Sequence, residues 1–144
     1  MVNLETTYLG LKLKNPLVAA SSGLTNTVES IRKLEAAGIG AVVLKSVFEE
    51  QINNEVTNLL SQDSQNISYP EAQDYIKNYL RDNTLTNQID LISETKKSVD
   101  IPVIASVNCV SAKEWISFAG DLQEAGADAL ELNIFYVPVG PHEE

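Results

Sequence analysis

Small polar side chains and a lysine follow short apolar runs in this chain, and these are the residues best suited to chemistry. Lys45 and Asn133 each come directly after such a run. A buried ammonium without a partner is costly, so Lys45 needs an anion nearby. One interpretation is an ion pair with Glu131 or Glu49. The other is that Lys45 holds an electron-rich ligand with help from Asn133, whose amide both donates and accepts. The remaining candidates after apolar runs are Ala20, Ser21, Ser22, Ser46, Ser106, Asn108 and Tyr136.

Other reactive or aromatic side chains are better explained by packing or by solvent exposure. Cys109 has no histidine near it in the sequence, so we expect a packed thiol rather than a nucleophile. His142 stands beside two carboxylates in the tail, which is too little for a metal centre, and no metal is expected. Trp115 and Phe118 lie one helical turn apart and are expected to pack against the sheet. Three tyrosines could cover a ligand but are expected to pack in the core, namely Tyr69, Tyr75 and Tyr79.

An internal repeat contains the elements that would position these residues. The stretch 16–45 can be laid over the stretch 102–133. Each begins with proline and a short apolar run, and continues with small polar residues, a helix-start signature and a helical apolar pattern. A glycine then precedes a second apolar run. Each repeat is therefore predicted to be strand, helix, strand, which is typical of a parallel βαβ unit.

Capping residues predict where the two helices of the repeats begin and end. Asn26 and Ser111 are each followed three residues later by glutamate, and this spacing predicts a helix start. Gly38 and Gly126 follow the helical patterns and predict their ends, because glycine readily adopts the left-handed conformation that terminates a helix.

The segments outside the repeats carry signals of their own. Pro70 predicts the start of a helix, and Thr84 predicts the cap of a further helix that ends near Val99. The residues 53–68 are rich in Asn, Gln and Ser and predict a loop or a marginal helix. The short apolar runs around Gly10 predict a small hairpin of the kind that closes the bottom of a barrel.

Four βα steps predict an α/β fold that forms half of a TIM-type (βα)8 barrel. A complete barrel typically needs about 250 residues, and this chain has 144. The runner-up is an open, flavodoxin-like sheet. A half-barrel exposes two strand edges and an apolar inner face, so we expect a homodimer or higher oligomer, or a fragment of a longer protein. The expected single domain, 1–144, comprises the hairpin 1–14, the first repeat 15–45, the second crossover 46–100, the second repeat 101–134 and the tail 135–144.

Composition and charge argue against several classes of protein. The chain has 20 acidic and 10 basic side chains and a formal net charge of −10, which disfavours binding to nucleic acid. No apolar run approaches the roughly 20 residues that cross a bilayer. The first residues lack the basic-then-apolar pattern of a signal peptide, and a single cysteine cannot form an intrachain disulfide. A cytoplasmic protein that does not contact membranes is therefore expected.

Three motifs resemble the class 1 dihydroorotate dehydrogenases in order and spacing. They are KNPLVAASSG at 14–23, GAVVLKS at 40–46 and ALELN at 129–133. Members of this family are cytosolic (βα)8 flavoproteins that use FMN to oxidise dihydroorotate to orotate in pyrimidine synthesis. The resemblance covers most of the chain, but only the amino-terminal half of such an enzyme.

The resemblance implies an FMN-dependent oxidoreductase that acts on a CH–CH bond of dihydroorotate or of a related small molecule. Lys45 would sit against the flavin and the substrate, and Asn133 would contact either of them. The residues that would line the cofactor are Ala20, Ser21, Ser22, Lys45, Ser46, Ser106 and Asn133.

The chain departs from the family pattern at two places. Tyr136 stands where the family has the cysteine that removes a substrate proton, and at neutral pH a phenol is a weaker base than an activated thiol. The family also has an Asn- and Gly-containing substrate loop after its second strand, yet no glycine lies between Gly40 and Gly120. The departures leave both dihydroorotate and a different substrate open.

The cofactor phosphate poses a separate question. Barrels commonly bind such a phosphate through the loops after strands seven and eight. The sequence predicts four strands and neither of these loops. We therefore expect the 144-residue chain alone to bind FMN weakly or not at all and to be catalytically idle. The alternative function is a non-catalytic half-barrel that self-associates. The expected partners are a second copy of the chain or a missing carboxyl-terminal half.

Overall fold

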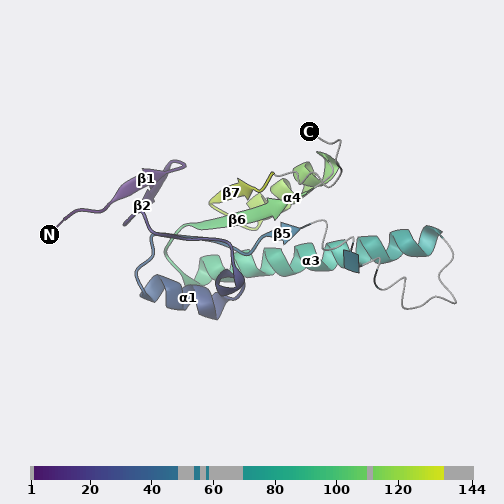
Figure 1. Ribbon diagram of the computed structural model, residues 1–144, viewed down its shortest axis with the longest axis horizontal. Coiled ribbons are helices and arrows are strands. Elements are labelled where there is room, and N and C mark those ends of the chain that lie inside the picture. The colour runs from purple at the N-terminus through teal and green to yellow at the C-terminus, as the bar shows by residue number, and fades with distance from the viewer. Residues whose placement is uncertain (1, 49–53, 56–57, 59–69, 110–111, 135–144) are drawn as a thin grey trace, which may run out of the picture.

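A parallel sheet with helices packed on one face, preceded by a small hairpin, makes up the protein (Figure 1). The computed structural model describes residues 2–48, 54, 55, 58, 70–109 and 112–134.

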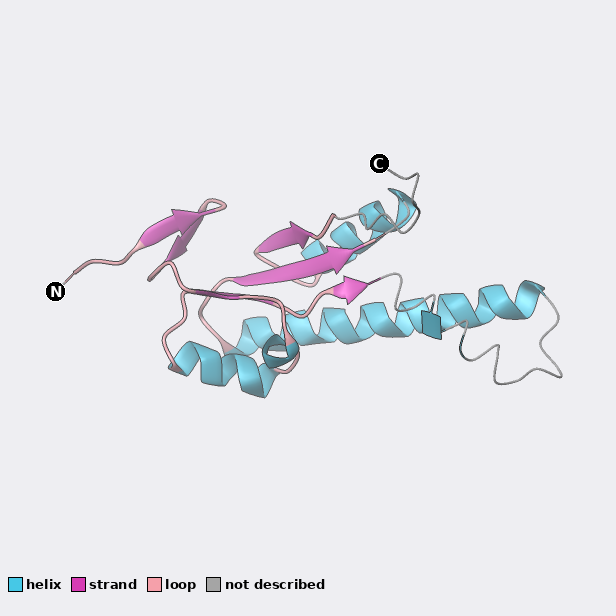
Figure 2. Cartoon of the chain, viewed as in Figure 1, coloured by secondary structure: helices cyan, strands magenta, loops and turns pink. Residues whose placement is uncertain are grey.

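The expected amino-terminal hairpin is present. β1 (Thr6–Tyr8) pairs antiparallel with β2 (Leu11–Leu13), and the two strands form a sheet of their own. The two residues between them, Leu9 and Gly10, have φ angles of 52° and 78°. Positive φ at both central residues is what a two-residue turn requires to match the twist of the flanking strands. Figure 2 shows the hairpin standing beside the main sheet.

The strands of the main sheet follow one another across it in chain order, with two short strands beside successive parts of a longer one. Its parallel strands are β3 (Val18–Ala19), β4 (Ala41–Val43), β5 (Val47–Phe48), β6 (Val103–Asn108) and β7 (Ala129–Leu132). β3 pairs with β4, β4 and then β5 pair with successive parts of β6, and β7 pairs along β6 as well.

This strand order identifies the architecture as half of a TIM-type barrel. Parallel strands that follow each other across the sheet in chain order are the arrangement of a βα barrel. A doubly wound, flavodoxin-like sheet reverses its order at a switch point. The described strands show no such reversal, so the flavodoxin-like alternative is wrong.

Helices cover one face of the sheet. They are α1 (Val28–Ala36), α3 (Pro70–Ser98) and α4 (Ala112–Glu124), and a 3-10 turn, η1 (Gly23–Thr25), precedes α1. As expected, Trp115 and Phe118 of α4 pack in or against this core. The buried core consists of Ile31, Val42, Leu44, Ile92, Val99, Ile101, Val103, Ala105, Val107, Cys109, Phe118 and Leu122.

The opposite face of the sheet is called the inner face here. Successive side chains of a strand point to opposite faces. Because Val42, Val103 and Ala105 point into the helical core, Val43 and Ile104 point to the inner face. In a complete barrel this face would surround the barrel interior.

The helix limits confirm part of the capping prediction. Gly38 and Gly126 both have φ of 99° and follow α1 and α4 as predicted. The predicted start at Asn26 is wrong, because Asn26 ends the 3-10 turn and Thr27 caps α1, its side chain accepting from the Ser30 amide at 3.3 Å. Ser111 lies outside the described residues.

α3 is one continuous helix, so the predicted cap at Thr84 is wrong. Residues 81–83 contain neither glycine nor proline, and nothing in the sequence interrupts the helical hydrogen bonds. The 29 residues of α3 span about 44 Å, about twice the length of the six-residue β6. The helix therefore extends past the sheet (Figure 1). Even so, none of the helices that the structure describes is apolar and long enough to cross a membrane.

The extension of α3 overturns the expectation that its tyrosines pack in the core. Tyr75 and Tyr79 are 72% and 63% exposed, because they lie on the part of the helix that has no sheet to cover. Tyr69 lies outside the described residues.

An ion pair on the surface of α1 joins two residues that are one helical turn apart. Lys33 Nζ lies 2.6 Å from Glu29 Oε1. This hydrogen bond and the lysine charge hold the pKa of Glu29 below its usual value. Because both side chains are exposed, the pair contributes little to stability.

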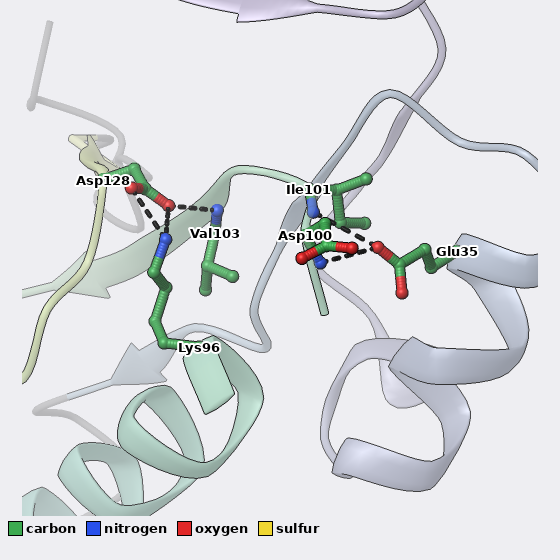
Figure 3. A network of polar contacts seen from close by, with 6 residues as sticks. All are labelled: Glu35, Lys96, Asp100, Ile101, Val103 and Asp128. Carbon is green, nitrogen blue, oxygen red and sulfur yellow. Dashed lines mark hydrogen bonds and ion pairs between the residues drawn. The ribbon is translucent and has the colours of Figure 1, made fainter. Parts of the chain in front are cut away.

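Two carboxylates hold the segment that leads into β6 (Figure 3). Glu35 of α1 accepts from the main-chain N–H groups of Asp100 and Ile101, at 2.8 and 3.2 Å. Asp128 accepts from the Val103 N–H at 2.7 Å, and Lys96 bonds the same carboxylate at 2.7 Å. Residue 102 is proline and has no N–H to satisfy. Every main-chain donor from residue 100 to 103 is therefore bound by a carboxylate.

Removal of the first carboxylate should destabilise the fold. We expect Glu35→Ala to lower the free energy of unfolding by about 1.5–3 kcal/mol, the usual contribution of hydrogen bonds to a charged group. Urea unfolding followed by circular dichroism would measure the change. Glu94→Ala, which removes an exposed carboxylate on α3, is the matched control. Equal unfolding midpoints for the two variants would show that Glu35 does not hold this segment.

Candidate functional site

Three of the predicted serines, together with Glu131, come from four neighbouring strands. Ser21 follows β3, Ser46 follows β4, Ser106 lies in β6 and Glu131 lies in β7. The carboxyl ends of parallel strands meet at one edge of a sheet, where barrels place their functional residues. The structure therefore brings three of the predicted cofactor residues to one edge of the inner face.

Three serines and a glutamate form a continuous line of hydrogen bonds at this edge. The Oγ atoms of Ser21 and Ser46 are 3.0 Å apart, and those of Ser46 and Ser106 are 2.6 Å apart. Ser106 donates to Glu131 Oε1 at 2.6 Å. The main-chain N–H of Ser46 also donates to Ser21 Oγ at 2.9 Å. We call Ser21, Ser46, Ser106 and Glu131 the hydroxyl chain.

Sequence reasoning missed the part that Glu131 plays in the hydroxyl chain. It considered this carboxylate only as a possible ion-pair partner of Lys45. The parallel register places Glu131 directly opposite Ser106, so both side chains share the inner face. Strand alternation with Asn133 was the available signal, because residues two apart in a strand point the same way.

Ala20 and Ser22 lie at the same edge but have other surroundings. The Ser22 side chain accepts from the Leu24 N–H at 3.3 Å, and the Ser22 N–H donates to Thr25 Oγ1 at 3.1 Å. Ser22 therefore caps the 3-10 turn η1. Ala20 is exposed and adjoins the inner face.

Lys45 ends its strand in an exposed position, contrary to the expectation of a buried ammonium. The main chain is fixed, because its N–H donates to Thr25 O at 3.2 Å and its carbonyl accepts from Gln88 Nε2 at 3.3 Å. Among the described residues no ion pair joins Lys45 to Glu131, whose carboxylate binds Ser106 instead. Water can solvate the exposed ammonium, which explains why no buried anion is needed. Glu49 lies outside the described residues.

A hollow of about 310 Å³ adjoins Lys45. It lies between the end of β4 and the side of α3, and Ser46 and Gln88 contribute to its wall. The exposed side chain of Lys45 therefore forms part of the wall of an open hollow.

Asn133 follows β7 and is held by its main chain. Its N–H donates to Val107 O at 2.9 Å, and its carbonyl accepts from the side chain of Asn108. The Asn133 side-chain amide is not used in these contacts, so it remains at the strand end with both a donor and an acceptor. The predicted residues Asn108 and Asn133 are thus neighbours.

A second hollow, of about 510 Å³, lies on the inner face between the hairpin and the sheet. Val18, Val43 and Ile104 line its apolar part, Tyr8 and Leu9 of the hairpin close one side, and Glu131 lies at its polar margin. The inner face is therefore apolar along the strands and polar at their carboxyl ends.

The remaining reactive side chains do not gather at the strand-end edge. Cys109 is buried in the helical core, as expected. No group of His, Cys, Asp and Glu side chains in the described ranges could hold a metal ion. Tyr136 and His142 lie outside those ranges.

Comparison with known proteins adds homology to this geometry. No protein family model matches the chain. The chain is 30% identical over 138 residues to the dihydroorotate dehydrogenase B (NAD(+)) catalytic subunit of Thermoplasma acidophilum, a match that covers 93% of this chain and 42% of that protein. It is 27% identical over 137 residues to the NAD-dependent dihydropyrimidine dehydrogenase subunit PreA of Escherichia coli K12, with 91% of this chain and 32% of that protein covered.

Two further proteins match the chain. The catalytic subunit of the same name from Methanocella arvoryzae is 31% identical over 126 residues, covering 87% of this chain and 38% of that protein. Among solved structures, an IMP dehydrogenase/GMP reductase-like protein from Corynebacterium glutamicum has a TM-score of 0.48 and 14% identity, covering 90% of this chain and 34% of that one. The chain spans less than half the length of each of these proteins. Over nearly its whole length it is homologous to the amino-terminal part of dihydroorotate dehydrogenases and related proteins, as its three motifs indicated.

Proposed function

We propose that this chain supplies the flavin- and substrate-facing strand ends of a dihydroorotate dehydrogenase-like oxidoreductase. The observation that carries the proposal is the convergence of Ser21, Ser46 and Ser106 in one hydrogen-bonded line beside Asn133. Lys45 lies next to Ser46 at the same edge. The reaction is the oxidation of a CH–CH bond, with dihydroorotate or a related cyclic molecule as the substrate.

The inner face has the chemistry that FMN needs. A flavin ring system has a flat apolar body and a polar edge, and the inner face offers apolar Val43 and Ile104 beside polar strand ends. The residues that would hold the ring are Ser21, Ser46 and Asn133, with Ala20 at the margin. When bound, FMN supplies the two-electron acceptor for the CH–CH bond.

Two side chains have proposed roles toward the substrate. The exposed ammonium of Lys45 would bind an anionic or electron-rich group of the flavin or of the substrate, since its main chain is fixed and its side chain is exposed. Tyr136, at the position of the family's base, would exchange the substrate proton. The hydroxyl of Ser22 is committed to the turn η1, so we assign it a structural role beside the cofactor.

Loss of the Lys45 ammonium should weaken flavin binding. One charge-assisted hydrogen bond is worth about 1.5–3 kcal/mol, so we expect Lys45→Ala to raise the Kd for FMN by about 10–100-fold. Of the two expectations for this chain alone, weak FMN binding and none, the proposal adopts weak binding, and quenching of flavin fluorescence on titration of FMN with protein would measure the Kd. Lys97→Ala, which removes an exposed lysine from the last turn of α3, is the control. Equal Kd values for wild type and Lys45→Ala, or no saturable binding by wild type, would contradict the proposal.

The open sheet supports a second function, the association of two copies of the chain. β3 and β7 each pair with one strand only among the described residues, and unpaired strand edges favour association. The hollow on the inner face is lined largely by apolar side chains, and Val18 there is 37% exposed. A second copy would bury this face.

A charge on the inner face should prevent that association. We expect size-exclusion chromatography with light scattering to give a dimer mass for wild type and a monomer mass for Val18→Lys, because burial of an unpaired ammonium is costly. Ile116→Lys, at a position on α4 that is 79% exposed, should remain a dimer. A folded wild-type monomer at micromolar concentration would refute self-association.

A further inference from the structure

The hydrogen bonds of the hydroxyl chain can run in only one donor-to-acceptor direction. A serine hydroxyl has a single proton to donate, and an ionised carboxylate only accepts. The hydroxyl of Ser106 donates its hydrogen bond to Glu131 Oε1. Its 2.6 Å contact with Ser46 must therefore be donated by Ser46. By the same count, the 3.0 Å contact between Ser46 and Ser21 must be donated by Ser21.

This direction determines which hydrogen-bonding groups the strand ends can present to a ligand. The protons of Ser21, Ser46 and Ser106 are all used within the chain, and their remaining capacity is oxygen lone pairs. The Ser46 N–H occupies one acceptor site of Ser21. This edge therefore offers acceptors, whereas Lys45 and the amide of Asn133 offer donors.

Packing alone does not explain why a serine of the hydroxyl chain lies in the middle of a buried strand. Ser106 lies between Ala105 and Val107 in a strand whose six residues are all buried, and its own exposure is 0%. A buried hydroxyl costs free energy unless it is hydrogen-bonded, so an apolar residue would suit a purely structural position. The hydroxyl lies in the middle of β6, where it joins Glu131 to Ser46.

We propose that Glu131 is a positioning residue that acts through Ser106 to orient the hydroxyls of Ser46 and Ser21 at the strand-end site. Its carboxylate is the terminal acceptor, so its negative charge sets the direction of every hydroxyl dipole in the chain. This inference rests on the proposed function where it treats Ser21 and Ser46 as flavin contacts. The orientation itself is a property of the protein without a ligand.

The test is amide NMR spectroscopy of the protein without a ligand. We compare wild type, Glu131→Gln, Ser106→Ala and the double variant, each labelled with ¹⁵N. Glu131→Gln preserves the shape of the side chain but can donate to Ser106, which removes the fixed direction. We expect it to shift the amide signals of Ser21 and Ser46, although neither residue is among the hydrogen-bond partners of Glu131. In the Ser106→Ala background the same substitution should leave both signals in place.

Controls separate orientation from general disturbance. Glu124→Gln, an exposed carboxylate on α4, should leave Ser21 and Ser46 unshifted. If Glu131→Gln disturbs signals throughout the sheet, Glu131→Asp provides the second variant, and it should shift Ser21 and Ser46 only when Ser106 is present. Unchanged signals in the single variant, or equal shifts with and without Ser106, would overturn the proposal.

Flavin titration of the same variants distinguishes this inference from the proposed function. We call the dependence of the Ser21 and Ser46 amide shifts on Ser106 the coupling. If this coupling is present and FMN binds, we expect Glu131→Gln to raise the Kd for FMN several-fold, and to have no such effect once Ser106 is replaced. Coupling without saturable FMN binding by wild type would support the role of Glu131 and refute the flavin site. FMN binding without coupling would support the flavin site and refute the role of Glu131.

Discussion

Gly40→Ala is expected to lower the free energy of unfolding by about 2–3 kcal/mol, the upper range for overpacking a well-packed site. A Cβ at this position would overlap the main-chain oxygen of Asn15 and lie 3.1 Å from Asn15 Oδ1. The glycine cannot move away easily, because its N–H donates to Leu17 O at 2.7 Å.

Asn15 cannot yield either. Its Nδ2 donates to Gly38 O at 2.8 Å, and its Oδ1 accepts from the Leu17 N–H at 3.0 Å. The side chain therefore ties the segment before β3 to the turn between α1 and β4. A methyl group at residue 40 would have to break at least one of these bonds.

A second glycine provides the control for this prediction. Gly120 lies in α4, and a Cβ there would meet no atom within 4 Å. Because alanine favours a helix over glycine by about 1 kcal/mol, Gly120→Ala should stabilise the protein. Thermal unfolding of both variants would measure the difference. Equal melting temperatures for the two would show that the close approach at Gly40 does not constrain the fold.

The second large effect concerns Phe118. We expect Phe118→Ala to lower the free energy of unfolding by about 3–5 kcal/mol, because it leaves a cavity in the core. Phe118 is 1% exposed, and the guanidinium carbon of Arg81 lies 5.6 Å from the centre of its ring. The aromatic ring thus joins α4 to both the sheet and α3.

Urea unfolding would measure this loss against a neighbour on the same helix. Ile116 is 79% exposed, so Ile116→Ala should change the free energy of unfolding by less than about 0.5 kcal/mol. A similar change for both variants would mean that α4 does not pack on the sheet through Phe118.

Local patterns in the sequence predicted most of the fold. The repeat, with its glycines Gly38 and Gly126, predicted the βαβ units, because a helix end and the adjacent strand are encoded by neighbouring residues. The predicted caps at Asn26 and Thr84 were wrong. Asn26 ends a 3-10 turn instead of beginning α1, and Thr84 lies inside the continuous helix α3.

The candidate site was predictable in its members but not in its connections. Ser21, Ser46 and Ser106 could be selected because each follows or lies in an apolar run. Their hydrogen bonds depend on strand register, which joins residues up to 60 positions apart. The partner of Glu131 could not be read from the sequence for the same reason. The exposure of Lys45 likewise depends on how α3 lies beside β4.

The most direct test of the central claim is an NMR titration of the ¹⁵N-labelled protein with FMN. If the strand ends form the flavin site, the amide signals of Ser21, Ser46, Ser106 and Asn133 will shift together along one saturable curve. Signals of the exposed face of α4, such as Ile116, will stay in place. An absence of saturable shifts, or shifts confined to the hairpin, would contradict the proposed function.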